Sequence, residues 1–332
     1  MHPQRLPEGL RGRPVRLPDD LPAVVELVRA YDAHHLDRPT EPPESTVAQL
    51  EQLDHPDEDV LVVEDAAGSL IGLAIFEPAD PPAHPGPAPE HWFDQYVLPG
   101  YPAAADLTSA LTGAALAHTQ VVLAREGVAS ARLETGAARA DTISAEVFGA
   151  HGFTLERTFW EMARQLGPDV AEPGAAPPGV VIRQGRQEPG DRELIHRLVD
   201  TAFRDHWGHV SRDTATWWTR FEALVGIDPE QWWLAELDGV PVGVCLGDAS
   251  RAGENGGYVR TLGVVREARG RGIAKHLLRV AFADHRRRGW AFSALRVDST
   301  SPTGAPALYR SVGMTPTDIL DLYARTVDAE PS

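Results

Sequence analysis

The segment Gly256–Trp290 reads GGYVRTLGVVREARGRGIAKHLLRVAFADHRRRGW. A β-like run, YVRTLGVV, precedes two glycines within Arg269–Ala274, and apolar residues then recur at helical spacing. The glycines therefore lie between a predicted strand and the N-terminus of a predicted helix. The first turn of a helix has unpaired N–H groups and a partial positive charge, and glycine lets a bulky anion approach the backbone. The segment is a candidate pyrophosphate cradle, to which Arg269 and Arg271 add charge.

Two other glycine-rich phosphate motifs do not fit this segment. The dinucleotide fingerprint requires a third glycine where this chain has Lys275. The P-loop requires a Gly-Lys-Ser/Thr ending, which is absent. By itself, an Arg-Gly-x-Gly run is equally consistent with a turn that carries surface arginines.

The segment resembles the acyl-CoA signature of the GNAT superfamily, Gln/Arg-x-x-Gly-x-Gly/Ala, with Arg269, Gly272 and Ala274 at the defined positions. Val297–Met314 is similar to the strand and helix that follow in that family, and the resemblance covers nearly all of residues 180–327. It implies an acyl-CoA site, with acetyl-CoA as the expected donor. The residues that the resemblance places at this site are Leu262, Gly263, Val264, Arg269, Gly270, Arg271, Gly272, Ile273, Ala274, Lys275 and Ser301. Leu262–Val264 corresponds to the strand whose amides pair with the pantetheine arm, and Ser301 stands where the family often has Asn.

The resemblance also implies direct transfer of the acyl group from the thioester to an amine. In the sequence Leu-Tyr-x-x-x-Gly, Tyr309 occupies the position of the family's usual general acid, which would protonate the leaving thiolate. The alternative is that Tyr309 is a half-buried core residue of a short helix. No general base is identified, because the strand Tyr258–Val265 has no Glu.

The acceptor site is expected within Ala202–Arg220, between the first helices of this half. Asp205, His206 and His209 are candidate bases, and Trp207 is a candidate pocket residue. Each of these residues is also consistent with an ordinary surface or core position. The His-x-x-His spacing lacks the Glu of a zinc motif, so no metal is expected.

The two halves of the chain have the same predicted order of strands and helices. This order predicts an α/β fold with two tandem GNAT domains, each a mixed, mostly antiparallel sheet flanked by helices. The expected domains are residues 10–165 and 180–328, joined by a Pro- and Gly-rich linker at 166–179. The layout resembles tandem GNAT proteins of actinobacteria. Chance similarity between two α/β halves is the alternative to duplication.

The first half lacks the features that mark the cofactor site. Tyr96–Thr112 aligns with the glycine loop but lacks its motif, and Asp106 lies near the expected phosphate position, where it would repel an anion. Phe148 stands where the second half has Tyr309. The first domain is therefore expected to be degenerate and non-catalytic, although a second cofactor site with unusual contacts is an alternative.

The bulk composition narrows the class of protein. Residues 179–332 hold 20 basic and 20 acidic residues, so the 11 basic and 28 acidic residues of 1–178 account for the net charge of −17. An acidic surface argues against nucleic-acid binding, and no run of about 20 apolar residues indicates a membrane span. Cys245 is the only cysteine and is expected in the core. A cytoplasmic enzyme is expected, either a monomer with an internal pseudo-dimer or a homodimer.

Three functions are consistent with these features. The first is an N-acetyltransferase that acts on a small-molecule amine. The second is an acetyltransferase for the N-terminus of a protein or peptide. The third, from a different class, is a non-catalytic acyl-CoA sensor. Tyr309 and the open acceptor segment favour an enzyme.

Overall fold

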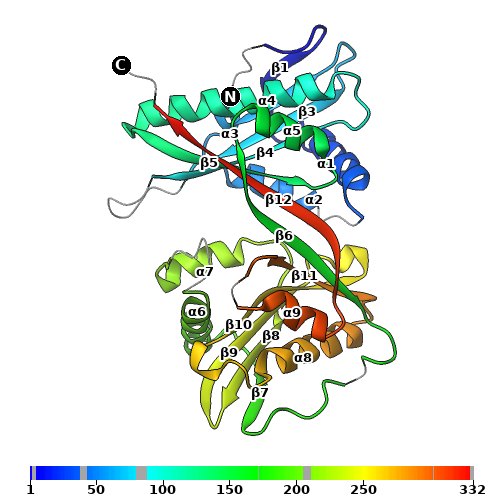
Figure 1. Ribbon diagram of the computed structural model, residues 1–332, viewed down its shortest axis with the longest axis vertical. Helices are drawn as coiled ribbons and strands as arrows, with labels where there is room; N and C mark the ends of the chain where they lie inside the picture. Colours follow the sequence, from blue (N-terminus) through cyan, green and yellow to red (C-terminus); the bar gives the residue numbers. More distant parts are fainter. Residues whose placement is uncertain are drawn as a thin grey trace. The chain divides into compact units, whose positions relative to one another are not determined.

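The chain forms two compact units in a computed structural model that describes residues 1, 5–37, 43–79, 88–170, 172–204, 211–301 and 303–329. Unit 1 comprises Met1–Phe159 and Asp318–Ser332, and unit 2 comprises Trp160–Thr317. Both units combine a mixed sheet with flanking helices, as the sequence predicts (Figure 1).

Unit 1 contains five helices and a six-stranded run of the sheet among the described residues. Its strand order is β1-β2-β3-β4-β5-β12. The elements are β1 (Arg11–Pro14), α1 (Leu21–His35), α2 (Pro43–Gln52), α3 (Pro56–Asp59), β2 (Val60–Glu64), β3 (Leu70–Glu77), β4 (Glu90–Val97), α4 (Ala104–Glu126), β5 (Ser130–Ala138), α5 (Thr142–Ala150) and β12 (Thr315–Asp328).

Unit 2 repeats this arrangement with the strand order β7-β8-β9-β10-β11-β6. Its elements are β6 (Thr154–Gln165), β7 (Val180–Gln184), α6 (Pro189–Phe203), α7 (Thr214–Glu222), β8 (Ile227–Leu237), β9 (Val240–Asp248), the 3₁₀ turn η1 (Ala252–Glu254), β10 (Gly256–Val264), the 3₁₀ turn η2 (Arg266–Ala268), α8 (Ile273–Arg287), β11 (Phe292–Asp298) and α9 (Ala305–Ser311).

The same arginine bridge occurs at the start of each unit. In unit 1, Arg13 of β1 contacts Asp20, which precedes α1, and Glu64 of β2 at 2.6 and 2.5 Å. In unit 2, Arg183 of β7 contacts Asp191 of α6 and Glu236 of β8 at 2.7 and 3.0 Å. The hydrogen bond from the guanidinium lowers the pKa of each aspartate. The same three-residue contact at matching positions supports duplication over chance similarity.

The last strands of the two units, β6 and β12, are not separated at the predicted linker, residues 166–179. The second part of β6 belongs to unit 2, whereas the end of β12 belongs to unit 1 and pairs with β5 from Leu320 to Asp328. Leu166 and Val170, which fall within the expected linker, are buried in the hydrophobic core of unit 2. The two units therefore take their last strands from opposite halves of the sequence.

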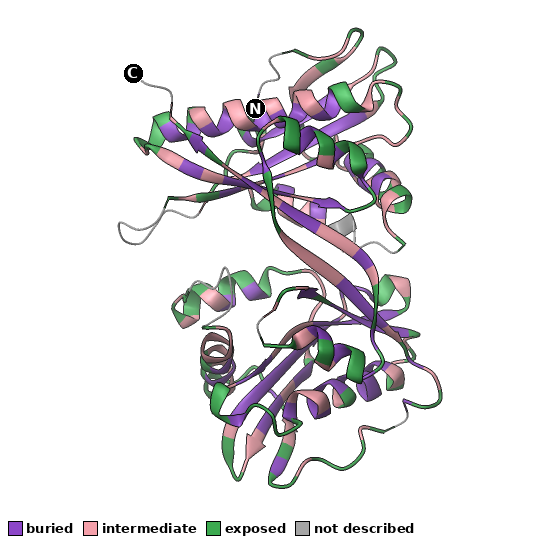
Figure 2. Cartoon of the chain, in the orientation of Figure 1, coloured by how far each residue is buried: buried purple, intermediate pink, exposed green. Residues whose placement is uncertain are grey.

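Helices cover both faces of the sheet in unit 2. Cys245 of β9 packs in the cluster that contains α8 and α9, whereas its neighbours Val244 and Leu246 pack in the cluster that contains α6 and α7. This alternation is the period-two pattern of a strand. Figure 2 shows buried residues concentrated along the central strands of each unit.

Helix α4 is long and apolar enough by length and composition to cross a membrane, which differs from the expectation for the sequence. Its buried residues, among them Leu107, Leu111 and Val122, pack in the core of unit 1. That packing is typical of the core helix of a globular protein.

Candidate functional site

The candidate site begins where two parallel strands of unit 2 separate. Strand β10 pairs with β11 only from Gly256 to Tyr258, although β10 continues to Val264. A register shift between Val259 and Thr261 interrupts its pairing with β9 on the other edge. The edge of β10 that faces β11 therefore has backbone groups beyond Tyr258 that no β11 pairing uses. Such groups can hydrogen-bond an extended ligand.

The glycine loop connects the end of β10 to α8, which is the position that the sequence predicts. Gly270 and Gly272 have φ angles of +77° and +78°, which side-chain-bearing residues rarely adopt. A Cβ atom would meet nothing within 4 Å at Gly270, and only Pro177 at 3.6 Å at Gly272. The requirement for glycine is therefore conformational, because the surrounding space would accept a side chain.

Helix α8 begins directly after this loop, with Gly272 at the N-cap. The first hydrogen bond from the helix to the cap joins the amide of His276 to the carbonyl of Gly272 at 3.0 Å. The amides of Ile273, Ala274 and Lys275 precede that bond and have the orientation that favours an anion at a helix N-terminus. Ile273 is 1% exposed and anchors the turn in the core, while Arg271 is exposed.

Arg269 has a structural contact that the sequence does not reveal. Its Nε donates to the carbonyl of Val264 at 3.0 Å, and its Nη2 donates to the carbonyl of Ala202 at 2.9 Å. The side chain thus ties the end of α6 to the end of β10 and shapes the loop. Its positive charge stays beside the candidate phosphate position.

The strand residues Leu262–Val264 differ in their roles. Leu262 is partly buried against the α8-side core, and Val264 is buried in it. A Cβ atom on Gly263 would lie 2.8 Å from the Cβ atom of Ala202 and 3.2 Å from Phe203. Gly263 therefore permits the close approach of α6 to β10.

Tyr309 lies in α9 and is 8% exposed, within the same hydrophobic cluster as Val259 and Cys245. Burial raises the pKa of the Tyr309 hydroxyl well above its usual range and raises the pKa of the Cys245 thiol to about 12. No hydrogen bond to the Tyr309 hydroxyl is found in the described part of the chain. The phenol therefore stays protonated and can still donate its proton.

Strand β6 holds α9 in place. Arg164 of β6 donates from Nη1 to the carbonyl of Val312 at 2.5 Å, just after α9 ends. Trp160 of the same strand lies under the guanidinium of Arg310, with 4.7 Å from the ring centroid to Cζ. The expected first domain, residues 10–165, includes these β6 residues, whereas they belong to unit 2. The repeated Ala-Arg pair at 163–164 and 324–325 reveals the duplication but not which unit each strand enters.

Ser301 lies in the loop before α9 and is partly exposed. Its hydroxyl is 2.9 Å from the hydroxyl of Thr303, and its carbonyl accepts from the amide of Gly304 at 3.2 Å. Its contact with a cofactor stays a prediction.

The residues predicted for the acceptor, Asp205, His206, Trp207 and His209, lie outside the described residues. Other aromatic residues that could line an acceptor pocket are used in packing. Trp218 and Trp232 are buried in the α6/α7 cluster, and Trp217 stacks on Phe221 with centroids 4.8 Å apart. Among the described residues, no group of three or more His, Cys, Asp or Glu side chains is placed to hold a metal.

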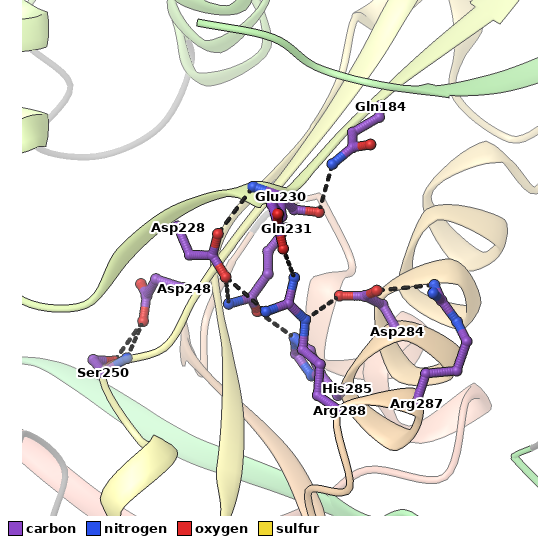
Figure 3. A network of polar contacts seen from close by, with 10 residues as sticks. All are labelled: Gln184, Asp228, Glu230, Gln231, Asp248, Ser250, Asp284, His285, Arg287 and Arg288. Atoms are coloured by element: carbon purple, nitrogen blue, oxygen red, sulfur yellow. Dashed lines mark hydrogen bonds and ion pairs between the residues drawn. The ribbon is translucent and has the colours of Figure 1, made fainter.

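A polar network at the other end of α8 is structural (Figure 3). His285 is 1% exposed and contacts Ser293 Oγ at 2.9 Å and Gln231 Oε1 at 3.1 Å. Burial lowers the pKa of this imidazole to about 3, with a smaller contribution from Arg288. A Cβ atom on Gly257 would lie 2.4 Å from the ring, so glycine is required beneath it. The network joins β8, α8 and β11 through a neutral histidine.

Comparison with known families identifies unit 2 as an acyl-CoA-dependent N-acetyltransferase domain of the GNAT type. The family model described as "Acetyltransferase (GNAT) family" matches residues 192–314. A mycothiol acetyltransferase of Thermobispora bispora is 32% identical over 272 residues, which are 77% of this chain and 80% of that protein. The chain belongs to the GNAT acetyltransferase family.

Solved structures agree with this assignment across the full length of the chain. A GCN5-related N-acetyltransferase from Sphaerobacter thermophilus has a TM-score of 0.78 and 25% identity and covers 99% of both chains. A tandem GNAT protein from the clavulanic acid biosynthesis pathway has a TM-score of 0.67 and 18% identity, covering 97% of this chain and 99% of the other. The second likeness concerns the fold alone.

Proposed function

We propose that the protein transfers an acetyl group from acetyl-CoA to the amine of a small molecule by direct attack on the thioester. The observation that carries this proposal is the glycine loop between β10 and α8, with two glycines at positive φ before a helix N-terminus. This backbone suits a pyrophosphate, and the adjoining edge of β10 suits an extended pantetheine arm. Donor binding is therefore assigned to unit 2.

The chain supplies two functions beyond binding the donor. Backbone amides on the edge of β10 would polarise the thioester oxygen, where negative charge develops in the transition state. The Tyr309 hydroxyl would give a proton to the leaving thiolate. Because burial raises the pKa of Tyr309, the phenol is fully protonated at neutral pH before transfer.

Unit 1 offers a poor site for the same donor. Helix α4 occupies the position of α8, but Asp106 lies in its first turn, where its charge opposes a phosphate. Phe148, which aligns with Tyr309, is fully buried and has no hydroxyl. We therefore propose that unit 1 binds no acyl-CoA and performs no transfer.

A small amine is proposed as the acceptor because the two curated relatives are named mycothiol acetyltransferase. One is 32% identical to this chain, and the other, from a Nocardioides species, is 30% identical over 182 residues. Mycothiol without its acetyl group is therefore the first acceptor to test. Amino sugars, amino alcohols and short peptides with free N-termini complete the panel.

The test is a screen of this panel with acetyl-CoA, which measures release of the free CoA thiol. The proposal expects one group of small amines to raise thiol release well above the rate without acceptor. Turnover confined to peptides would refute the small-molecule assignment. Tight binding of acetyl-CoA without turnover of any amine would instead support a sensor.

A further inference from the structure

The short parallel ladder between β10 and β11 ends where the candidate donor site begins. Its three residue pairs are Gly256 with Phe292, Gly257 with Ser293, and Tyr258 with Ala294. From Tyr258 to Val264, β10 then runs about 20 Å towards the glycine loop, at about 3.3 Å per residue. CoA carries its pyrophosphate and its thioester at opposite ends of the pantetheine arm. A donor that follows this edge from the glycine loop therefore has its thioester towards the ladder.

The two glycines of the ladder are covered by side chains on opposite faces of the sheet. A Cβ atom on Gly256 would overlap the ring of Phe292, which packs with Tyr258 and is 4% exposed. A Cβ atom on Gly257 would overlap the imidazole of His285, which comes from α8. Successive residues of a strand face opposite sides, so the two rings hold the ladder from both faces. Glycine is required at both positions because of this close packing.

Both ring nitrogens of His285 are used in hydrogen bonds. Nε2 lies 3.1 Å from Gln231 Oε1 (Figure 3), and Nδ1 lies 2.9 Å from Ser293 Oγ. The amide nitrogen of Gln231 donates to Asp228 Oδ2 at 3.0 Å, so its oxygen faces the imidazole as an acceptor. The proton of the neutral imidazole is therefore on Nε2, and Nδ1 accepts from the hydroxyl of Ser293. One neutral tautomer satisfies both contacts.

This hydrogen-bonded chain crosses four neighbouring strands. Gln231 of β8 lies over Gly247 of β9, where a Cβ atom would be 3.2 Å from the glutamine Cβ and Oε1. His285 lies over Gly257 of β10 and reaches Ser293 of β11. The three polar side chains are at most 1% exposed. Buried polar groups lose free energy when a partner moves away, so the chain fixes the spacing of β8 to β11 beside the ladder.

Unit 1 has a different arrangement at the corresponding place. Leu123 of α4 takes the position of His285, because the carbonyl of each accepts from the amide that follows the helix-terminating glycine, from Val128 and Trp290 respectively. Strands β4 and β5 pair over four residue pairs, none of which contains glycine. The polar chain with its glycines therefore occurs in the unit to which donor binding is assigned, and an apolar residue replaces its central histidine in the other unit.

We propose that His285 is a positioning residue for acetyl transfer, which fixes the end of the β10–β11 ladder and thereby the β10 amides that polarise the thioester. It acts through Gly257 and Ser293, because its own side chain is buried. The inference rests on the proposed function, since it concerns the same donor site. The glycine loop lies at the far end of β10, so loss of the imidazole should leave the pyrophosphate contacts intact. It should move the amides away from the thioester oxygen.

The test measures the infrared stretch of the thioester carbonyl of carbon-13-labelled acetyl-CoA, bound to the full-length protein without an acceptor. Hydrogen bonds that polarise the carbonyl lower this frequency, so the bound donor should absorb below the free donor. In His285→Asn about half or more of that shift should be lost, because the amides no longer meet the oxygen. The Kd for acetyl-CoA from calorimetry should change by less than about threefold. Ser293→Ala, which keeps the imidazole and its contact with Gln231, should give a smaller loss in the same direction.

His118→Asn in unit 1 is the matched control. His118 is an 8% exposed histidine of α4 that contacts Asp59 at 2.7 Å, so its loss should lower the melting temperature without changing the carbonyl frequency. A wild-type frequency in the folded His285→Asn and Ser293→Ala variants would overturn the inference and leave His285 as a packing residue, while the proposed function would stand. Failure of the wild type to bind acetyl-CoA would instead refute the proposed function, and this inference with it.

Discussion

Replacing Tyr309 by Phe isolates the proposed proton donor. The ring is 8% exposed and packs in the core of unit 2, and Phe keeps that packing. The hydroxyl has no hydrogen bond among the described residues, so its removal breaks none that involves them. We therefore expect the free energy of unfolding to change by less than about 1 kcal/mol.

The expected effect of Tyr309→Phe on the reaction is much larger. General acid catalysis by one side chain contributes about 10²–10⁴ in rate. A hundredfold loss corresponds to about 2.7 kcal/mol in the activation barrier. Because the donor contacts are kept, kcat should fall while the KM for acetyl-CoA stays close to its original value.

The assay measures thiol release and the melting temperature on the same sample, with Tyr323→Phe in unit 1 as the matched control. Tyr323 has a partly exposed ring on β12, in the core cluster of unit 1. The control should retain full activity. If Tyr309→Phe keeps more than about half its turnover, the proton comes from elsewhere. A large loss of stability with activity retained per folded molecule would make Tyr309 a packing residue.

Three further predictions concern the loop, the buried histidine and the domain boundary. Gly272→Glu should abolish most acetyl-CoA affinity in calorimetry, because it adds an anion at a position with a φ of +78°. The control Gly100→Glu in unit 1, at a φ of +76°, should leave the acetyl-CoA affinity unchanged. Equal effects of the two substitutions would place the donor site elsewhere. Lowering the pH from 7 to 5 should reduce the free energy of unfolding by about 2 kcal/mol through His285. This imidazole must be neutral in the folded state, where burial lowers its pKa from 6.5 to about 3. Its contribution to stability is complete above pH 6.5 and is lost as the pH falls. Denaturant titrations should show a weaker pH dependence in His285→Asn, and an unchanged one would assign the loss to other groups. A fragment of residues 180–328 should be insoluble or unfolded by circular dichroism, because it lacks the β6 core residues; a cooperative melt like that of the full chain would contradict the observed units.

The sequence was sufficient for the family, the fold class and the position of the glycine loop between a strand and a helix. A strand, two glycines and an apolar helical repeat identify that position, whereas the positive φ angles of Gly270 and Gly272 were not predicted. The repeated order of strands and helices was also readable, because turn residues and β-branched runs are local signals.

Long-range contacts could not be read in the same way. Strand β6 has the apolar pattern of a closing strand, but that pattern fits the edge of either unit equally well. The contact of Arg269 with the carbonyls of Val264 and Ala202 depends on how α6 packs against β10. The hydrogen bond from Tyr31 of α1 to Asp141, the N-cap of α5, joins residues 110 positions apart.

We propose one acyl-CoA site per chain, at the glycine loop of unit 2. The most direct measurement is a calorimetric titration of the full-length protein with acetyl-CoA. We expect a stoichiometry of one per chain, and loss of that single site in Gly272→Glu. Two equivalent sites, or one site unaffected by Gly272→Glu, would contradict it.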